Sequence, residues 1–407
     1  MNEQELIPHL FRKEFSKITA VLCKFFGLEH IQVAEDITSE TFITALETWP
    51  RNGIPENPTG WLYTVAKNKA RNFLNRRQIF RDKVSPKIQQ SDGSMEIDIE
   101  MSEKNITDSQ LQMLFAVCHP TIPVESQIGL ALRILCGFGI DEIANAFLTN
   151  KETINKRLYR ARKTFRDEKI EMELPSASEI DQRLDTVLTT LYLLFNEGYY
   201  SESNDMILRK DLCLEALRLT YLLAKNEETS TPDVLAFLAL MCFHSSRFEA
   251  RKNQHGEIVL YEDQDPLLWN QELIAQGAYF LSQASGGDEI SKYHLEAGIA
   301  WWHTLKTESE DKWRNILQLY NQLLKIDASP IVALNRIYAL SKVRGNETAI
   351  KEAESLKLES NQYYQTLLGV LYKEMDIHQA KKHLQKAYSL ASNATEKLTI
   401  QKKIDSL

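Results

Sequence analysis

The sequence has few of the features that would support a disulfide framework, a metal centre or a membrane anchor. Its cysteines are odd in number and widely spaced, with no C-x-x-C pair, and Cys118 adjoins His119 without ligand spacing. This usage predicts buried thiols in a reducing cytoplasm, with neither a metal nor a cofactor. An apolar N-terminal signal region and any apolar run of about 18 residues are missing, which disfavours secretion and a place in a membrane. The cysteines are Cys23, Cys118, Cys136, Cys213 and Cys242.

The sequence also lacks a nucleophile–base pair or a metal-ligand spacing that would argue for catalysis. We therefore expect a binding protein rather than an enzyme. The 407 residues exceed one ordinary core and predict two to four domains. A hydrophobic content of 43% with 26% charged residues is typical of a soluble globular protein.

The formal net charge of −8 is unevenly distributed along the chain. Residues 1–172 hold 23 basic and 23 acidic side chains, so the remaining 25 basic and 33 acidic side chains carry the whole excess. The N-terminal part is therefore neutral with basic clusters, whereas the C-terminal part is acidic and ill suited to a phosphate backbone.

Two short helices separated by a polar turn are predicted within residues 139–166. The first has apolar residues at helical spacing between Ile140 and Phe147, and residues 148–150 form the turn. The second combines a narrow apolar seam with a broad cationic surface, at the spacing of a helix-turn-helix. Its seam is Ile154, Leu158 and Ala161, and its cations are Lys151, Lys156, Arg157, Arg160, Arg162, Lys163 and Arg166.

A basic run can also be a solvated helix face. Here only Glu152 precedes the central turns, and Asp167 and Glu168 follow them, so intrahelical ion pairs do not account for the pattern. We therefore interpret the second helix as a DNA-binding helix.

Residues 1–80 predict three helices. The first has one amphipathic face and stops near Gly27, and the second runs from about Val33 to Trp49. A proline-rich breaker at 50–58 then predicts a turn before the third helix at 57–77. In the second helix we expect burial of Ile37, Phe42, Ile43 and Leu46.

The third helix joins aromatic rings at its start, Trp61 and Tyr63, to a cluster of cations between Lys67 and Arg77. Single-stranded nucleic acid favours this combination, because cations follow the backbone and rings accept unstacked bases. Trp61 can equally be a core anchor. From residue 79 to residue 108 periodicity fades into a polar, acidic segment, which predicts a flexible linker, and helices return at Leu111.

This ordered layout resembles regions 2 and 4 of a bacterial sigma factor of the compact extracytoplasmic-function (ECF) type. Residues 34–50, 57–77 and 139–166 carry the resemblance. It implies that the first segment binds core RNA polymerase, that the second melts and reads the −10 promoter element, and that the third reads the −35 element in duplex DNA. Asn72 stands where the family often has Asp, so an Asp-dependent contact in the melting helix is not carried over.

The resemblance implies three sets of contact residues. Core polymerase would meet Glu35, Asp36, Glu40, Thr41 and Phe42. The −10 strand would meet Trp61, Lys67, Asn68, Arg71, Arg76 and Arg77. The −35 duplex would meet Lys151, Thr153, Asn155, Lys156, Arg157 and Arg160.

The C-terminal part continues as helices that ordinary ECF factors do not have. Helix pairs at 329–356 and 363–391 recur at about the 34-residue period of tetratricopeptide (TPR) repeats. Small residues such as Gly369 and Ala380 stand where paired helices must approach closely. Residues 195–201, 209–219 and 238–269 look like the hallmarks of the ECF group that carries a TPR-like C-terminal extension, so the resemblance covers essentially the whole chain.

Polar residues are dense within the otherwise apolar helices of residues 196–269. They predict either a pocket for a small protein or ligand, or a buried polar network that pins loops to helices, and we favour the network. The residues are Asn196, Glu197, His244, Arg247, Arg251, Asp263, Gln264, Asp265 and Trp269.

We predict an all-α, cytoplasmic sigma factor that directs core RNA polymerase to promoter DNA and is modulated by its own extension. Its expected parts are region 2 at 1–80, a linker at 81–108, region 4 at 109–172 and the TPR-like extension at 173–407. One alternative is a dimeric helix-turn-helix operator-binding regulator with a sensing helical domain, which leaves Ala34–Trp49 unexplained. Another is an enzyme, which requires Glu197, His244 and Asp265 to converge in one pocket.

Overall fold

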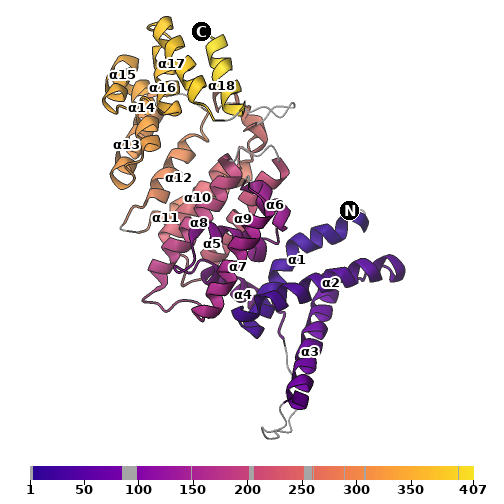
Figure 1. The fold of residues 1–407 in the computed structure, drawn as a ribbon. Coiled ribbons are helices and arrows are strands. Elements are labelled where there is room, and N and C mark those ends of the chain that lie inside the picture. The colour runs from indigo at the N-terminus through magenta and orange to yellow at the C-terminus, as the bar shows by residue number, and fades with distance from the viewer. Residues whose placement is uncertain are drawn as a thin grey trace. The chain divides into compact units, whose positions relative to one another are not determined.

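The computed structural model describes residues 3–84, 99–147, 149–200, 206–251, 259, 261–287, 289–306, 309–392 and 394–407. Every regular element within these residues is a helix, which confirms the predicted all-α fold (Figure 1). The chain forms two compact units, Met1–Thr229 and Ser230–Leu407. Among the described helices none has the length and apolar character needed to cross a bilayer.

Three long helices open the first unit. They are α1 (Glu3–Phe26), α2 (Ile31–Asn52) and α3 (Pro58–Val84), with the short turn η1 (Leu28–His30) before α2. Both α2 and α3 pack on α1, and α3 also packs on α2.

The end of α2 differs from the prediction that Pro50 starts a turn. The helix continues through Pro50 to Asn52: the φ of proline fits a helix, although Pro50 gives up one backbone hydrogen bond in the last turn. The chain reverses at Gly53, whose φ of 84° suits a residue without a Cβ and whose N–H donates to the Trp49 carbonyl (2.9 Å).

The buried face of α2 is narrower than predicted. Ile37 and Phe42 are buried as expected, but Ile43 and Leu46 are 51% and 54% exposed, so the prediction of their burial is wrong. The helix turns about 100° per residue, and the core side is filled by Thr38, Thr41 and Ala45 instead.

Seven further elements complete the first unit. Helix α4 begins at Glu103, inside the expected linker, because Ser102 caps it by accepting from the Asn105 N–H (3.3 Å). Residues 85–98 of that linker lie outside the described residues. The elements are α4 (Glu103–Val117), α5 (Val124–Leu130), the π-turn η2 (Ala131–Leu135), α6 (Ile140–Ala146), α7 (Lys151–Asp167), α8 (Ile180–Tyr200) and α9 (Met206–Lys225).

Helices α8 and α9 lie beyond residue 172, yet they belong to the first compact unit. They pack on each other, and α8 also packs on α4 and α5. Arg183 donates to the Phe115 carbonyl (2.7 Å), Arg218 donates to the Leu135 carbonyl (2.7 Å), and Thr190 donates to the Gln127 side chain (2.6 Å).

All five cysteines are buried free thiols, as predicted. Burial raises the pKa of Cys118 and of Cys242 to about 12, which keeps both thiols protonated.

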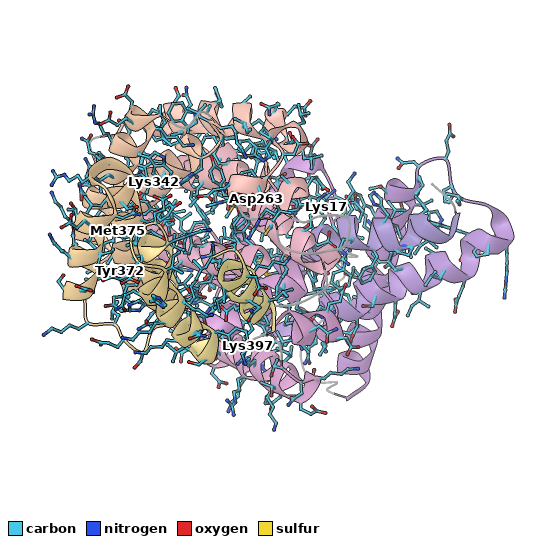
Figure 2. The ribbon with its side chains drawn as sticks, turned by 90° about the horizontal axis from the view of Figure 1, so that it is seen from above. Lys17, Asp263, Lys342, Tyr372, Met375 and Lys397 are labelled. Atoms are coloured by element: carbon cyan, nitrogen blue, oxygen red, sulfur yellow. The ribbon has the colours of Figure 1, made fainter. Side chains whose placement is uncertain are left out.

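The second unit is an array of helices. It begins with α10 (Pro232–Ser245). Three short turns follow, η3 (Glu249–Arg251), η4 (Tyr261–Asp263) and η5 (Pro266–Leu268). The remaining helices are α11 (Gln271–Ala284), α12 (Lys292–Trp302), α13 (Glu310–Ile326), α14 (Pro330–Arg344), α15 (Asn346–Ser355), α16 (Gln362–Tyr372), α17 (Ile377–Leu390) and α18 (Ala394–Asp405). Figure 2 marks Lys342 on α14 and Tyr372 at the end of α16.

The predicted helix pairing is confirmed in this array. Helix α14 pairs with α15, and α16 pairs with α17. Leu334, Ala349 and Leu368 are buried in one apolar cluster that joins the two pairs. A Cβ on Gly369 would lie 2.6 Å from Leu384 Cγ, so the close approach of α16 and α17 requires glycine there.

Candidate nucleic-acid interface

Helices α6 and α7 form the predicted helix-turn-helix. The Gly139 N–H donates to Glu142 Oε2 (2.7 Å), which fixes the start of α6. Asn150 caps α7 by accepting from both the N–H (2.8 Å) and the hydroxyl (2.9 Å) of Thr153. Thr153 is therefore held by the cap at the start of the helix.

One side of α7 is core and the other faces solvent. Ile154, Leu158, Ala161 and Phe165 are buried, which extends the predicted seam by one turn. Arg157 and Thr153 are partly exposed, and the side chains that face solvent include Lys151, Asn155, Lys156 and Arg160. Lys151 pairs with Asp141 of α6 (2.5 Å), but both side chains are more than 60% exposed, so this pair stabilises the fold by at most about 1 kcal/mol.

Arg162 does not join the solvent-facing cations. It donates from Nη2 to Glu35 Oε2 (2.6 Å) on α2, and Arg133 of η2 donates from Nε to Glu35 Oε1 (2.9 Å). The Glu35 side chain is 6% exposed, so a buried carboxylate of the first three helices is neutralised by two arginines of the helix-turn-helix part. Arg162, which the sequence analysis counted among the cations of the helix surface, is therefore used inside the unit.

The residues expected to bind polymerase divide into two groups. Asp36 and Glu40 are exposed, and Glu40 pairs with Lys69 of α3 (3.3 Å). Glu35, Thr41 and Phe42 are buried, and a partner could not reach them in this arrangement.

Sequence reasoning placed Glu35, Asp36, Glu40 and Glu47 on the outward face of α2, which is wrong for the buried Glu35, and it missed that Ile43 completes an exposed stripe. Asp36, Glu40, Ile43 and Glu47 follow one another every third or fourth residue, and all four are exposed, with Leu46 beside them. The spacing of these residues along the helix indicates one exposed face. The sequence analysis did not recognise the whole face, because it assigned Ile43 and Leu46 to the core.

Helix α3, which the sequence predicts to melt the −10 element, carries some of its expected residues on its surface. Asn68 and Arg71 are exposed, and Lys67 is partly buried. The side chains of Arg76 and Arg77 lie outside the described residues.

The two rings at the start of α3 have partners within the unit. Trp61 is partly buried and packs edge-on against buried Trp49, with ring centroids 5.4 Å apart. The Tyr63 hydroxyl donates to Glu14 Oε2 (2.6 Å), and burial together with this carboxylate raises the pKa of Tyr63. The core-anchor interpretation of Trp61 therefore agrees better with the packing.

Arg12 joins three helices of the first unit. Its guanidinium contacts Glu142 of α6 (2.9 Å) and Asp211 of α9 (3.2 Å), and it lies 4.7 Å above the Phe138 ring. Gln110 of α4 also donates to Ser16 of α1 (3.2 Å) in a buried position. These contacts hold α1 to the helix-turn-helix part and to α9.

The nine polar residues of the expected C-terminal pocket do not belong to one unit. Asn196 and Glu197 lie on α8 of the first unit, and the other seven lie in the second unit. Asp265 is exposed and caps η5 by accepting from the Leu267 N–H (2.9 Å). Burial and the charges of Arg247, Arg251 and His303 lower the pKa of His244 well below its usual value.

The chain around η4, before α11, is held in place by hydrogen bonds from Lys306, which follows α12. Lys306 donates from Nζ to the carbonyls of Tyr261 (3.4 Å), Glu262 (3.2 Å) and Gln264 (2.6 Å). Gln264 and Trp269 are buried at the same loop, and Trp269 stacks on Tyr261. This geometry agrees with a structural polar network at these positions. In the described part of the chain no group of three or more His, Cys, Asp or Glu side chains could hold a metal ion.

Comparisons with known proteins identify two families in the chain. Residues 10–79 match the family model of Sigma-70 region 2. Residues 183–285 match a family of unknown function (DUF6596), which spans α8 to α11. No solved structure matches the chain.

Three related proteins place these matches in context. An uncharacterized protein of Rhizobium meliloti is 33% identical over 393 residues, which cover 95% of this chain and 92% of that protein. The ECF RNA polymerase sigma-E factor of Haemophilus influenzae is 26% identical over 36% of this chain and 78% of its own length. The RNA polymerase sigma-H factor of Pseudomonas aeruginosa is 28% identical over 36% of this chain and 77% of its own length. With a sigma region 2, sigma-factor relatives and a further helical part that the Rhizobium protein shares, the chain belongs to the extracytoplasmic-function sigma factors that carry a C-terminal extension.

Proposed function

We propose that this sigma factor directs core RNA polymerase to specific promoters, and that the helices after residue 172 modulate it by holding its free form closed. The −10 element would be met by α3, the −35 element by the solvent face of α7, and both steps would proceed by binding and strand separation without bond chemistry. Its place of action would be the cytoplasm, where its polymerase partner and promoter DNA are.

The observation that carries the closed form is the buried Glu35, whose two partners also precede residue 172. A polymerase-binding helix gains nothing from placing a carboxylate where a partner cannot reach it. Glu35 instead forms ion pairs with Arg133 and Arg162, and these pairs hold α2 against η2 and α7. Because two promoter elements lie well apart along DNA, α3 and α7 would have to separate for both to be occupied, and this ion pair opposes that separation.

Helices α8 and α9 supply a second restraint. Residues 173–229 hold 11 acidic and 5 basic side chains, so they carry −6 of the formal net charge. They contact α1 through Arg12 and Asp211, and they contact α4 and η2 through Arg183 and Arg218. An acidic hairpin packed on a DNA-binding part would disfavour approach of a phosphate backbone and stabilise the closed form.

The exposed stripe of α2 would be the first contact with polymerase. Asp36, Glu40, Ile43 and Glu47 combine carboxylates with an aliphatic side chain that is about half exposed, and such a surface suits a basic, partly apolar partner. Binding there would precede opening, after which Glu35 would become available.

The test removes both arginines from Glu35 in the full chain, with Arg133→Met and Arg162→Met together. A buried carboxylate without partners costs about 3–5 kcal/mol, and opening the unit hydrates it, so the variant should favour the open form. We expect tighter co-purification with bacterial core RNA polymerase and a stronger run-off transcript from the DNA upstream of its own gene.

The matched control is Lys163→Met, which removes a cation from α7 whose nearest acid is Asp167 at 3.9 Å, with both side chains exposed. Polymerase affinity should not change in this variant. Equal polymerase affinity of the double variant and the natural chain, with both folded, would contradict the closed-form proposal. No polymerase binding by either chain, together with tight binding of a duplex operator by a dimer, would favour the helix-turn-helix regulator instead.

A further inference from the structure

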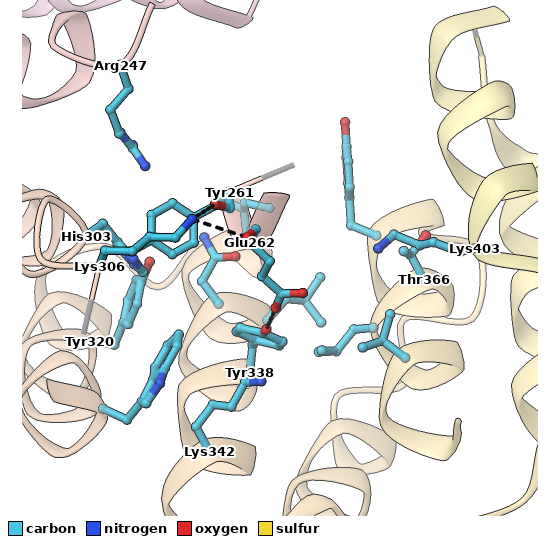
Figure 3. A pocket seen from close by; sticks show the side chains of 17 residues that line it. Arg247, Tyr261, Glu262, His303, Lys306, Tyr320, Tyr338, Lys342, Thr366 and Lys403 are labelled. Carbon is cyan, nitrogen blue, oxygen red and sulfur yellow. Dashed lines mark hydrogen bonds between the residues drawn. The ribbon is translucent and has the colours of Figure 1, made fainter. Parts of the chain in front are cut away.

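The second unit contains a groove of about 830 Å³ on the inner side of its helical repeat (Figure 3). One wall is the η4 turn with Tyr261 and Glu262, and another is Lys306 in the segment that follows α12. The remaining walls are the inward faces of α13, α14 and α16, with Lys403 of α18 at the far side.

The repeat helices present unburied apolar side chains to this groove. Ile331 at the start of α14 is 48% exposed and Tyr363 at the start of α16 is 53% exposed, and both line the groove. Tyr338 follows Ile331 two turns later on the same face of α14. Ile331 and Tyr363 therefore leave apolar and aromatic surface exposed at the groove, whereas Tyr338 also packs against the core of the unit.

The charges of the groove have one dominant sign. Among the described residues that line it, Arg247, Lys306, Lys342 and Lys403 are cations and Glu262 is the one acid. Residues 230–407 as a whole hold 20 basic and 22 acidic side chains, so the groove is positive within a slightly acidic unit. A surface of this kind attracts an anionic partner.

Two of these cations remain available. Among the described residues no acid lies within ion-pair distance of Lys342 or Lys403. Lys342 lies 5.1 Å above the Tyr338 ring and 5.8 Å from the Trp313 ring, an arrangement that positions the ammonium without neutralising it. Lys306, in contrast, is committed to the three backbone carbonyls of the η4 loop.

The walls of the groove are fixed in place by polar contacts. Lys312 donates to the Tyr261 hydroxyl (3.1 Å) and to the Leu305 carbonyl (2.7 Å), and the Tyr338 hydroxyl donates to Glu262 (3.0 Å). A preformed groove loses little conformational freedom when it is filled, which favours binding.

We propose that this groove binds an acidic peptide segment of a partner protein, with carboxylates separated by aliphatic side chains. Lys342 and Lys403 lie on separate sides of the groove in Figure 3, so a compact anion such as phosphate would meet only one of them. An extended peptide advances about 3.3 Å per residue and can reach both while its aliphatic side chains cover Ile331 and Tyr363. This inference goes beyond the proposed sigma function and rests on the second unit alone.

The experiment pans the full-length chain against a phage library of random dodecapeptides and then measures the enriched peptide, made with a fluorescein label, by fluorescence anisotropy. We expect enriched sequences to alternate acidic and aliphatic residues. Replacing both available lysines, Lys342→Glu with Lys403→Glu, should weaken binding by about tenfold or more, because two charge-assisted contacts are reversed. Ile331→Asp should weaken it as well.

The matched control is Lys325→Glu with Lys381→Glu, which makes the same charge change at exposed positions of α13 and α17 outside the groove. The control should bind the peptide as the natural chain does. Enrichment of no acidic sequence, or an equal loss in the control and the groove variant, would overturn the proposal. Complete displacement of the peptide by inorganic phosphate or ATP at concentrations near its own Kd would also overturn it, in favour of a small-anion site.

Discussion

At the scale of single residues, α7 separates into cations that face solvent and one that is used inside the protein. Arg160 is exposed on the same side as Lys156, whereas Arg162, two residues later, reaches Glu35. A helix places residues two apart on different sides, so this division follows from geometry. The proposed promoter-reading face of α7 therefore consists of the cations that remain on its solvent side.

Replacing Arg160 tests whether this face reads bases. If Arg160 reaches a base edge in the major groove, Arg160→Ala should cost about 1–3 kcal/mol at the specific promoter and little on unrelated duplexes. Gel-shift titrations of the polymerase-bound chain on both duplexes, at two salt concentrations, measure this difference. Lys104→Ala is the control, since it removes an exposed cation of α4 outside the interface.

An equal loss on every duplex, with a salt slope lower by about one, would assign Arg160 to a phosphate contact instead. The base-reading hypothesis would then be wrong, although the sigma assignment would stand.

The sequence was informative about residue types and less so about partners. The seam of α7 and the buried cysteines followed from periodicity and spacing. The burial of Glu35 did not, because its partners Arg133 and Arg162 lie 98 and 127 residues away in the chain. Long-range ion pairs leave no local pattern, so a polar residue that looks like a surface contact can be an internal one.

At the scale of elements, helix pairs were predictable because their constraint is local. Gly369 lets α16 approach α17, and any Cβ there would meet both Leu384 and the Ala380 carbonyl, the latter at 3.2 Å. Element ends were less predictable. Ser102 starts α4 ahead of the apolar periodicity, and Gly53 rather than Pro50 ends α2.

Replacing Gly369 with alanine should destabilise the repeat although alanine is the better helix former. The intrinsic gain is about 1 kcal/mol, but displacing α16 from α17 to relieve a 2.6 Å contact should cost about 1–3 kcal/mol or more. Urea unfolding, followed by far-ultraviolet circular dichroism, gives the free energy of unfolding of each variant.

The comparison variant is Gly129→Ala in α5, where a new Cβ would meet only Leu158 Cδ2 at 3.8 Å. That substitution should stabilise the protein slightly or leave it unchanged. A gain in stability at Gly369 equal to that at Gly129 would contradict the close packing of the two helices.

At the scale of the whole molecule, family boundaries and structural boundaries differ. The sequence predicts that region 4 ends at residue 172, whereas the first compact unit ends at Thr229. The DUF6596 match begins at residue 183 and therefore covers helices of both units. The DUF6596 match and the compact units therefore divide the chain at different residues.

Two truncations distinguish these boundaries. A chain ending at Thr229 keeps α8 and α9, and we expect it to be monodisperse by size-exclusion chromatography and to unfold cooperatively. A chain ending at residue 174 loses Val187, Leu188 and Leu191, all of which are at most 1% exposed, and it uncovers the surfaces of α4 and α5 on which α8 packs. Burial of apolar surface contributes about 25 cal/mol per Å², and an ordinary domain is stable by about 5–15 kcal/mol. Losing several such side chains removes much of that stability, so this shorter chain should aggregate or unfold.

A shorter chain as stable and monodisperse as the longer one would contradict this packing. It would mean that α8 and α9 contribute little to the stability of the first unit, and the restraint that they are proposed to exert on polymerase binding would lose its physical basis.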